Sequence, residues 1–212
     1  LMDVFKLNCM WLLCSLPIVT MGAATTAAYT ITLKMVNDEE GYIAGPFWKE
    51  FKANLKKGSI LGVIALVACY AVYLDFQLYH VAKQHNMMFL IVGVIGIYLI
   101  FMHIVFAFPL LARYENSIVN TMRNSYSIAA KFLGRTAFLA VLLVIEMAII
   151  LWNLTTMFAG LLIGPACIIL TISGFANSFF TVIERENLMA EQEEKEATQL
   201  NGEPISGDED DI

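Results

Sequence analysis

The sequence predicts an all-α protein, a polytopic transmembrane helix bundle with amphipathic cytoplasmic helices. Hydrophobic residues make up 58% of the 212 residues and charged residues only 15%, and the mean hydropathy is +0.68. Several windows of about twenty residues carry almost no charge, which is the length that a helix needs to cross the ~30 Å hydrocarbon core of a bilayer. We therefore expect a multi-pass membrane protein whose first partner is the lipid bilayer.

The net charge of −6 comes from one end of the chain. From Glu184 onward the sequence holds eleven acidic and two basic residues, so the preceding body carries a charge of +3. Such dense negative charge with few apolar side chains is typical of disordered segments. The sequence thus divides into a transmembrane helical domain, residues 1–183, and an acidic, mostly disordered cytoplasmic tail, residues 184–212. No basic domain is present that would indicate nucleic-acid binding.

The first apolar region contains two helix-compatible segments, residues 3–16 and 23–36. Pro17 disfavours helix immediately before it and Gly22 permits a tight reversal, so we expect a re-entering hairpin. The region from 3 to 36 is also longer than a single crossing requires. One kinked span is the alternative interpretation, and it would give five membrane segments instead of six. Because the sequence begins with Leu1, the first segment resembles the end of a longer span.

The hairpin contains a candidate packing or reversal motif. Small residues in membrane helices allow neighbouring backbones to approach closely, and threonine hydroxyls can bond to carbonyls one turn earlier. The motif consists of Pro17, Gly22, Thr25 and Thr26. A ligand site is the alternative interpretation, and packing is favoured because small residues most often serve helix interfaces. The G-x-x-x-G patterns that begin at Gly58 and Gly160 indicate the same kind of packing.

Four further spans are expected, at residues 58–79, 87–112, 136–155 and 159–183. The apolar run after Arg135 continues for about fifty residues and is interrupted only by Glu146, so it is too long for one crossing. Asn153 and the threonines after it supply the expected turn. Pro165 should kink or begin the last helix.

Basic residues fall in alternate connections, which predicts the orientation. Five lie between residues 34 and 57 and four between Arg113 and Arg135, whereas the 80–86 turn has only Lys83 and the 153–158 turn has none. Because basic loops stay on the cytoplasmic side, we expect the two basic connections and the tail there, with Lys83 on the opposite side.

Both cytoplasmic connections have an amphipathic helical pattern. In residues 46–57 the aromatic side chains share one face and the lysines share another, and residues 115–132 repeat the arrangement. A solvated face is the simpler interpretation, and a docking surface for a partner's cytoplasmic subunit is the alternative. The candidate docking face consists of Lys49, Lys52, Lys56 and Arg123.

Several of these patterns together resemble a known family. The points of likeness are Asn8-x-x-Trp11, the reversal Leu16-Pro17-x-x-Thr20-x-Gly22-Ala23-x-x-Thr26-Ala27, Phe51-Lys52-x-Asn54, Tyr73-Leu74-Asp75 and the segment around Arg113. They are similar to the YesL-like family of bacterial membrane proteins, which is grouped under a domain of unknown function, and the likeness extends to about residue 183. The resemblance implies a location in the bacterial cytoplasmic membrane and no assigned catalytic residues. It also implies carbohydrate ABC-transporter subunits as candidate partners, because such genes often lie beside those of the family.

Ionisable side chains within the expected spans are few. Inserting a charged Glu at the middle of a span costs about 2.5–3.5 kcal/mol, so Glu146 should have a polar partner. His103 lies at a similar predicted depth, and the two residues form a candidate intramembrane polar pair. A neutral Glu146 bonded to a carbonyl or a threonine is the alternative. The sequence shows no catalytic-triad order, no phosphate-binding loop and no metal-ligand spacing, and its four cysteines form no Cys-x-x-Cys pair. We therefore expect no enzyme, no cofactor and no metal site.

Two functions are compatible with these features. The first is a non-catalytic accessory or interaction protein associated with carbohydrate uptake. The second is a small-solute or proton-coupled transporter with His103 and Glu146 in its pathway. The sequence has no obvious inverted repeat, which favours the first.

Overall fold

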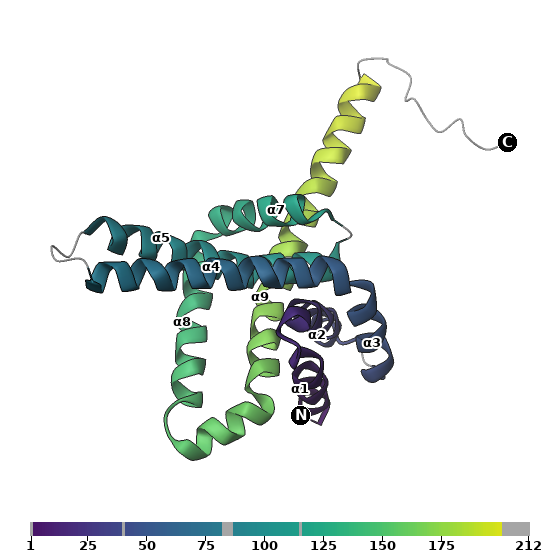
Figure 1. The fold of residues 1–212 in the computed structure, drawn as a ribbon. Coiled ribbons are helices and arrows are strands. Elements are labelled where there is room, and N and C mark those ends of the chain that lie inside the picture. Colours follow the sequence, from purple (N-terminus) through teal and green to yellow (C-terminus); the bar gives the residue numbers. More distant parts are fainter. Residues whose placement is uncertain (1, 40, 82–86, 115, 201–212) are drawn as a thin grey trace. The chain divides into compact units, whose positions relative to one another are not determined.

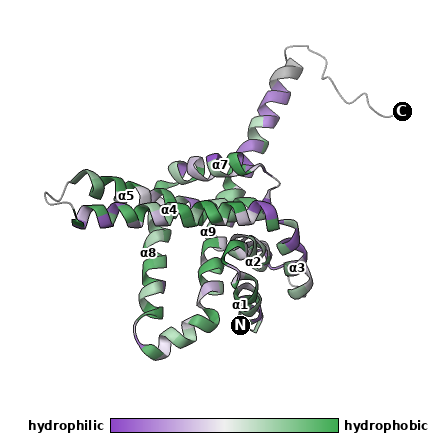
Figure 2. Ribbon diagram, in the orientation of Figure 1, coloured by the Kyte–Doolittle hydropathy of each residue, from purple (hydrophilic) through white to green (hydrophobic). Residues whose placement is uncertain are grey.

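The computed structural model describes residues 2–39, 41–81, 87–114 and 116–200, with side chains up to residue 196. Within these ranges every regular element is helical and no strand occurs, as the sequence predicts. Four of the described helices are long and apolar enough to cross a membrane: Leu55–Val81, Met87–Arg113, Leu133–Ile150 and Leu154–Glu196. The ribbon in Figure 1 shows these elements, and Figure 2 shows hydrophobic residues along most of their length. The chain forms two compact units, Leu1–Ala176 and Asn177–Ile212.

The chain begins with a helical hairpin. Helix α1 (Met2–Ser15) and helix α2 (Met21–Val36) are joined by the short 3-10 turn η1 (Ile18–Thr20). The Trp11 indole donates a hydrogen bond of 3.0 Å to the Thr25 hydroxyl, so the two helices lie side by side about the turn. At 1.5 Å per residue their 14 and 16 residues extend about 21 and 24 Å, less than the ~30 Å of a bilayer core. The region is therefore a short hairpin and not one kinked span.

The next elements are a short helix and a pair of long ones. Helix α3 (Ala44–Ala53) leads into α4 (Leu55–Val81), which packs along α5 (Met87–Met102). Lys83, whose side of the membrane the sequence predicts, lies outside the described residues. Helix α5 continues through the π-helical segment η2 (His103–Ala107) into α6 (Phe108–Arg113). Pro109 accounts for the change of winding, because its ring has no N–H and crowds the carbonyl four residues earlier.

The remaining elements are helices α7 (Ile118–Lys131), α8 (Leu133–Ile150) and α9 (Leu154–Leu200). Asn153 caps the start of α9: its side-chain oxygen accepts from the Thr156 backbone N–H at 2.9 Å, and the Thr156 hydroxyl donates to the Asn153 carbonyl at 2.9 Å. The turn predicted from Asn153 is thus confirmed.

The acidic tail departs from its prediction. Helix α9 continues to Leu200, so residues 184–200 are helical although the sequence assigns them to a mostly disordered segment. The physical reason is that Glu, Gln, Lys, Ala, Leu and Met dominate this stretch and are all strong helix formers. Its negative charge keeps this segment from packing into a core. It does not keep the segment from being helical. Disorder of residues 201–212 stays a prediction, because they lie outside the described residues.

Helix α2 is the centre of the N-terminal unit. It contacts α1, α3, α4 and α6, and ten of its sixteen residues are buried. Its buried residues are mostly Ala, Gly and Thr, so several helices can approach its backbone from different sides. Five of the residues that line the cavity described below lie on α2 or on the turn before it.

Candidate functional site: an apolar cavity beside helix α2

Glycines bring α2 and α4 into backbone contact. A Cβ atom at Gly22 would lie 2.9 Å from the Gly62 Cα, and one at Gly58 would lie 2.7 Å from the Ala23 Cα. Neither position has room for a side chain. Gly22 and the first G-x-x-x-G pattern therefore lie where the backbones of α2 and α4 cross.

The other members of the predicted motif have local partners. The Thr25 hydroxyl donates to the Met21 carbonyl at 2.8 Å, and the buried Thr26 hydroxyl donates to the Gly22 carbonyl at 2.9 Å. Pro17 lies at the reversal, where its carbonyl accepts from the Thr20 backbone N–H at 2.9 Å. The four motif residues thus lie in the hairpin, and both threonine hydroxyls are bonded to carbonyls of their own helix.

A second contact, for which the sequence has no local pattern, joins α1 to α9. The fully buried Asn8 amide donates to the carbonyls of Leu161 and Leu162 at 3.0 and 2.8 Å, and its oxygen accepts from the Ala166 backbone N–H at 3.2 Å. Pro165 explains this need, because it has no N–H to offer the Leu161 carbonyl four residues earlier. One side chain therefore satisfies the backbone groups left free by the proline.

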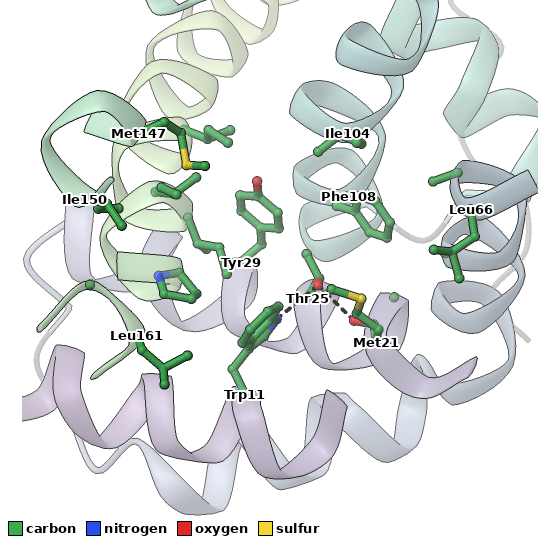
Figure 3. A pocket seen from close by; sticks show the side chains of 18 of the residues that line it. Trp11, Met21, Thr25, Tyr29, Leu66, Ile104, Phe108, Met147, Ile150 and Leu161 are labelled. Carbon is green, nitrogen blue, oxygen red and sulfur yellow. Dashed lines mark hydrogen bonds between the residues drawn. The ribbon is translucent and has the colours of Figure 1, made fainter. Parts of the chain in front are cut away.

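An apolar cavity of about 720 Å³ lies beside these contacts. Its wall draws side chains from the hairpin and from α4, η2, α6, α8 and α9, all within the N-terminal unit. Figure 3 shows the side chains that surround it, among them Trp11, Tyr29, Leu66, Phe108, Met147 and Leu161. Its volume falls within the ~300–1,000 Å³ typical of small-molecule sites.

The few polar side chains of the wall differ in their hydrogen bonding. Trp11 and Thr25 are bonded to each other, so neither donor is left unused. Tyr29 is only 1% exposed, and its hydroxyl, seen at the tip of the ring in Figure 3, points into the open space. The structure records no hydrogen bond to this hydroxyl from any described residue. Tyr29 is therefore the wall residue with an unused donor directed into the cavity.

The predicted pair of His103 and Glu146 is not formed. His103 is buried, and its Nε2 lies 3.3 Å from the Leu61 carbonyl, to which it must donate. Glu146 instead has Thr171 and Cys167 of α9 as its neighbours. No hydrogen bond or ion pair joins the two side chains, which both lie in described parts of the chain. Equal depth in two helices fixes height but not rotation about the helix axes, and the two side chains face different helices.

The candidate docking face is solvent-exposed. Lys49 and Lys52 project from α3, whose Phe47 and Phe51 are buried, whereas Trp48, expected on the same face as these rings, is 48% exposed. Lys52 lies 5.4 Å from the centre of the half-exposed Trp48 ring. The other two members, Lys56 at the start of α4 and Arg123 on α7, are also exposed.

Metal-ligating side chains do not gather in the described part of the chain. Among residues with described side chains, no three His, Cys, Asp or Glu lie close enough together to hold a metal ion. Within the described residues, the site is therefore an apolar cavity into which the Tyr29 hydroxyl points.

The four described helices that are long and apolar enough to cross a membrane place the chain in the class of multi-pass helical membrane proteins. A family model described as "Protein of unknown function, DUF624" matches residues 4–76. The matched region contains the hairpin, α3 and the part of α4 that crosses α2, so it holds most of the α2 side of the site. No curated protein and no solved structure matches the chain.

Proposed function

We propose that the protein is a non-catalytic accessory protein of the bacterial cytoplasmic membrane that binds subunits of a carbohydrate ABC transporter. The observation that carries this proposal is the way α3 is held. Its two phenylalanines are buried, with Phe47 0% and Phe51 8% exposed, while Lys49 and Lys52 face outward. A basic face on a helix that is already anchored loses little conformational entropy on binding, which favours docking to an acidic partner surface.

The choice of partner follows from the resemblance to the YesL-like family. Basic helices beside the membrane are well placed to meet the cytoplasmic parts of a permease or an ATPase. The DUF624 match covers α3 and supports the resemblance only at the level of a domain without a known function. The link to carbohydrate uptake is therefore part of the proposal.

Co-purification from the native membrane tests the proposal. We expect the tagged protein to retain a permease or ATPase of a carbohydrate transporter. Charge reversal at Lys49, Lys52, Lys56 and Arg123 should release that partner at physiological salt. Charge reversal at Lys34 and Lys195, two exposed lysines outside the face, is the control and should leave the complex intact. Release by both sets of changes, or retention by both, would contradict a specific docking face.

The transporter alternative has less support from the site. A proton-coupled pathway through His103 and Glu146 would require these groups to exchange protons, and they have separate partners. Uptake of a sugar or another small solute by the purified protein alone in vesicles would favour this alternative over the accessory function.

A further inference from the structure

We propose that the cavity beside α2 binds an uncharged hydrocarbon-chain molecule whose single oxygen acceptor receives a hydrogen bond from the Tyr29 hydroxyl. The class includes the acyl ester of a membrane lipid and a free long-chain ester or alcohol. The proposed site is distinct from the basic docking face and does not depend on it.

The hydroxyl of Tyr29 is the first argument. Buried tyrosine hydroxyls normally have a hydrogen-bond partner, because an unsatisfied donor in an apolar interior is costly. Tyr29 is 1% exposed, its hydroxyl points into the cavity, and no described residue accepts from it. A ligand oxygen in the cavity would supply the missing acceptor.

The composition of the wall is the second argument. No Lys, Arg, His, Asp or Glu lines the cavity, so an ionic group inside it would be unpaired in an apolar environment. Apart from the paired Trp11 and Thr25, the other wall side chains are aliphatic, aromatic or sulfur-containing. A hydrocarbon chain with one neutral oxygen matches this distribution of apolar surface and one donor.

The oxygen that would accept from the Tyr29 hydroxyl does not come readily from a helix of another protein, so a partner helix is a poor match for the cavity. The carbonyls of a transmembrane helix already accept hydrogen bonds within the helix, whereas an ester or alcohol oxygen in hydrocarbon has no other donor. The wall also contains Met21, Met147 and Met157, whose unbranched side chains adapt to irregular flexible chains. The occupant best matched to the cavity is therefore a lipid-like chain.

Trp11 provides a probe inside the wall. We would replace Trp48 and Trp152 by Phe, so that Trp11 is the only tryptophan in the detergent-solubilised protein. Bromine atoms quench indole fluorescence at short range, so dibromostearate methyl ester should quench Trp11 in a saturable manner. Tyr29→Phe removes only the hydroxyl and should weaken the apparent affinity about two- to tenfold.

Two controls separate cavity binding from contact with the outer surface. Ala65→Phe adds a ring to the cavity wall and should abolish saturable quenching, even where circular dichroism shows the native helix content. A protein that retains only Trp152, which is 82% exposed at the α8–α9 turn, should show no saturable quenching. Quenching that is unchanged in Ala65→Phe, or the absence of saturable quenching of Trp11, would overturn the proposal.

The charge and the source of the ligand can be resolved in the same system. The free dibromostearate acid, ionised at alkaline pH, should bind more weakly than its methyl ester, and equal binding would overturn the requirement for an uncharged group. Mass spectrometry of a solvent extract should find an intact phospholipid if the acyl chain belongs to the bilayer, or a free ester or alcohol otherwise. Either compound must be depleted in Ala65→Phe. A stable dimer that Ala65→Phe dissociates would identify a second copy as the occupant and would overturn the proposal.

Discussion

Helices α2 and α4 pack closely because glycines lie where they cross, whereas α1 and α9 are joined by the hydrogen bonds of a single side chain. At the α2–α4 crossing, Gly22, Gly58 and Gly62 bring two backbones into contact. At the α1–α9 contact, Asn8 fills the hydrogen-bonding gap that Pro165 leaves. In lipid there is little hydrophobic force between helices, so interfaces depend on close packing or on polar bonds. The comparison shows both solutions within one helical unit.

The glycine crossing should be the more sensitive of the two regions. A methyl group at Gly58 would lie 2.7 Å from the Ala23 Cα, so Gly58→Ala must separate the helices. We expect a loss of about 2–3 kcal/mol in the free energy of unfolding, measured by thermal denaturation in detergent.

The matched control is Gly134→Ala in α8, where an added Cβ would meet nothing within 4 Å. Because Ala is a better helix former than Gly, this change should be neutral or should stabilise by up to about 1 kcal/mol. Equal effects at the two glycines would show that the crossing is not under steric constraint.

Loss of the Asn8 side chain should destabilise the protein less than the change at Gly58, and a second change at Pro165 should reduce its effect. Asn8→Ala leaves the Leu161 carbonyl without a donor, so we expect a loss of about 2 kcal/mol in the free energy of unfolding. In a Pro165→Ala background the restored N–H can bond to that carbonyl within the helix, and the same change should cost about 1 kcal/mol less. If Asn8→Ala costs as much in both backgrounds, Asn8 acts through packing and not through the proline break.

These two regions also show how far the sequence predicts the fold. Four helices able to span a membrane, the hairpin reversal and the Asn153 turn follow from local patterns of hydropathy, Pro, Gly and capping residues. The α2–α4 crossing is indicated in the sequence by the G-x-x-x-G spacing. The Asn8 contact leaves only two separate signals, an amide in one apolar segment and a proline in another, at positions more than 150 residues apart. Pairing them requires the tertiary structure.

The candidate site follows the same rule. The amphipathicity of α3 is visible in sequence, but the cavity is formed by side chains from many helices, so no single segment reveals it. The sequence gives no sign of the role of Tyr29, because a tyrosine in a membrane helix has no distinctive pattern of neighbours. The pairing of His103 with Glu146 was wrong because depth can be counted along the sequence whereas rotation cannot.

A third interhelical contact should contribute less than either of these two regions. The Thr32 and Ser173 hydroxyls of α2 and α9 are 2.6 Å apart and fully buried. Thr32→Val removes this bond while conserving shape, and should cost about 1 kcal/mol in the free energy of unfolding. Thr30→Val is the control, because the Thr30 hydroxyl bonds only within its own helix, at 3.3 Å from the Thr26 carbonyl. Its effect should be less than half as large, and the reverse order would count against the Thr32–Ser173 bond.

The smallest expected effect is the coupling between His103 and Glu146, which contrasts with the coupling between Asn8 and Pro165. The His103 ring donates to the Leu61 carbonyl of α4, and Glu146 lies beside Thr171 of α9, so neither change removes a partner of the other. His103→Gln and Glu146→Gln should therefore have additive effects on thermal stability, with a coupling energy below about 0.5 kcal/mol. Each single change still has its own cost, since Gln at position 103 must find a new route to the Leu61 carbonyl. A double variant little less stable than either single variant would mean that the two side chains share a bond in the folded protein, and would contradict the separate partners described above.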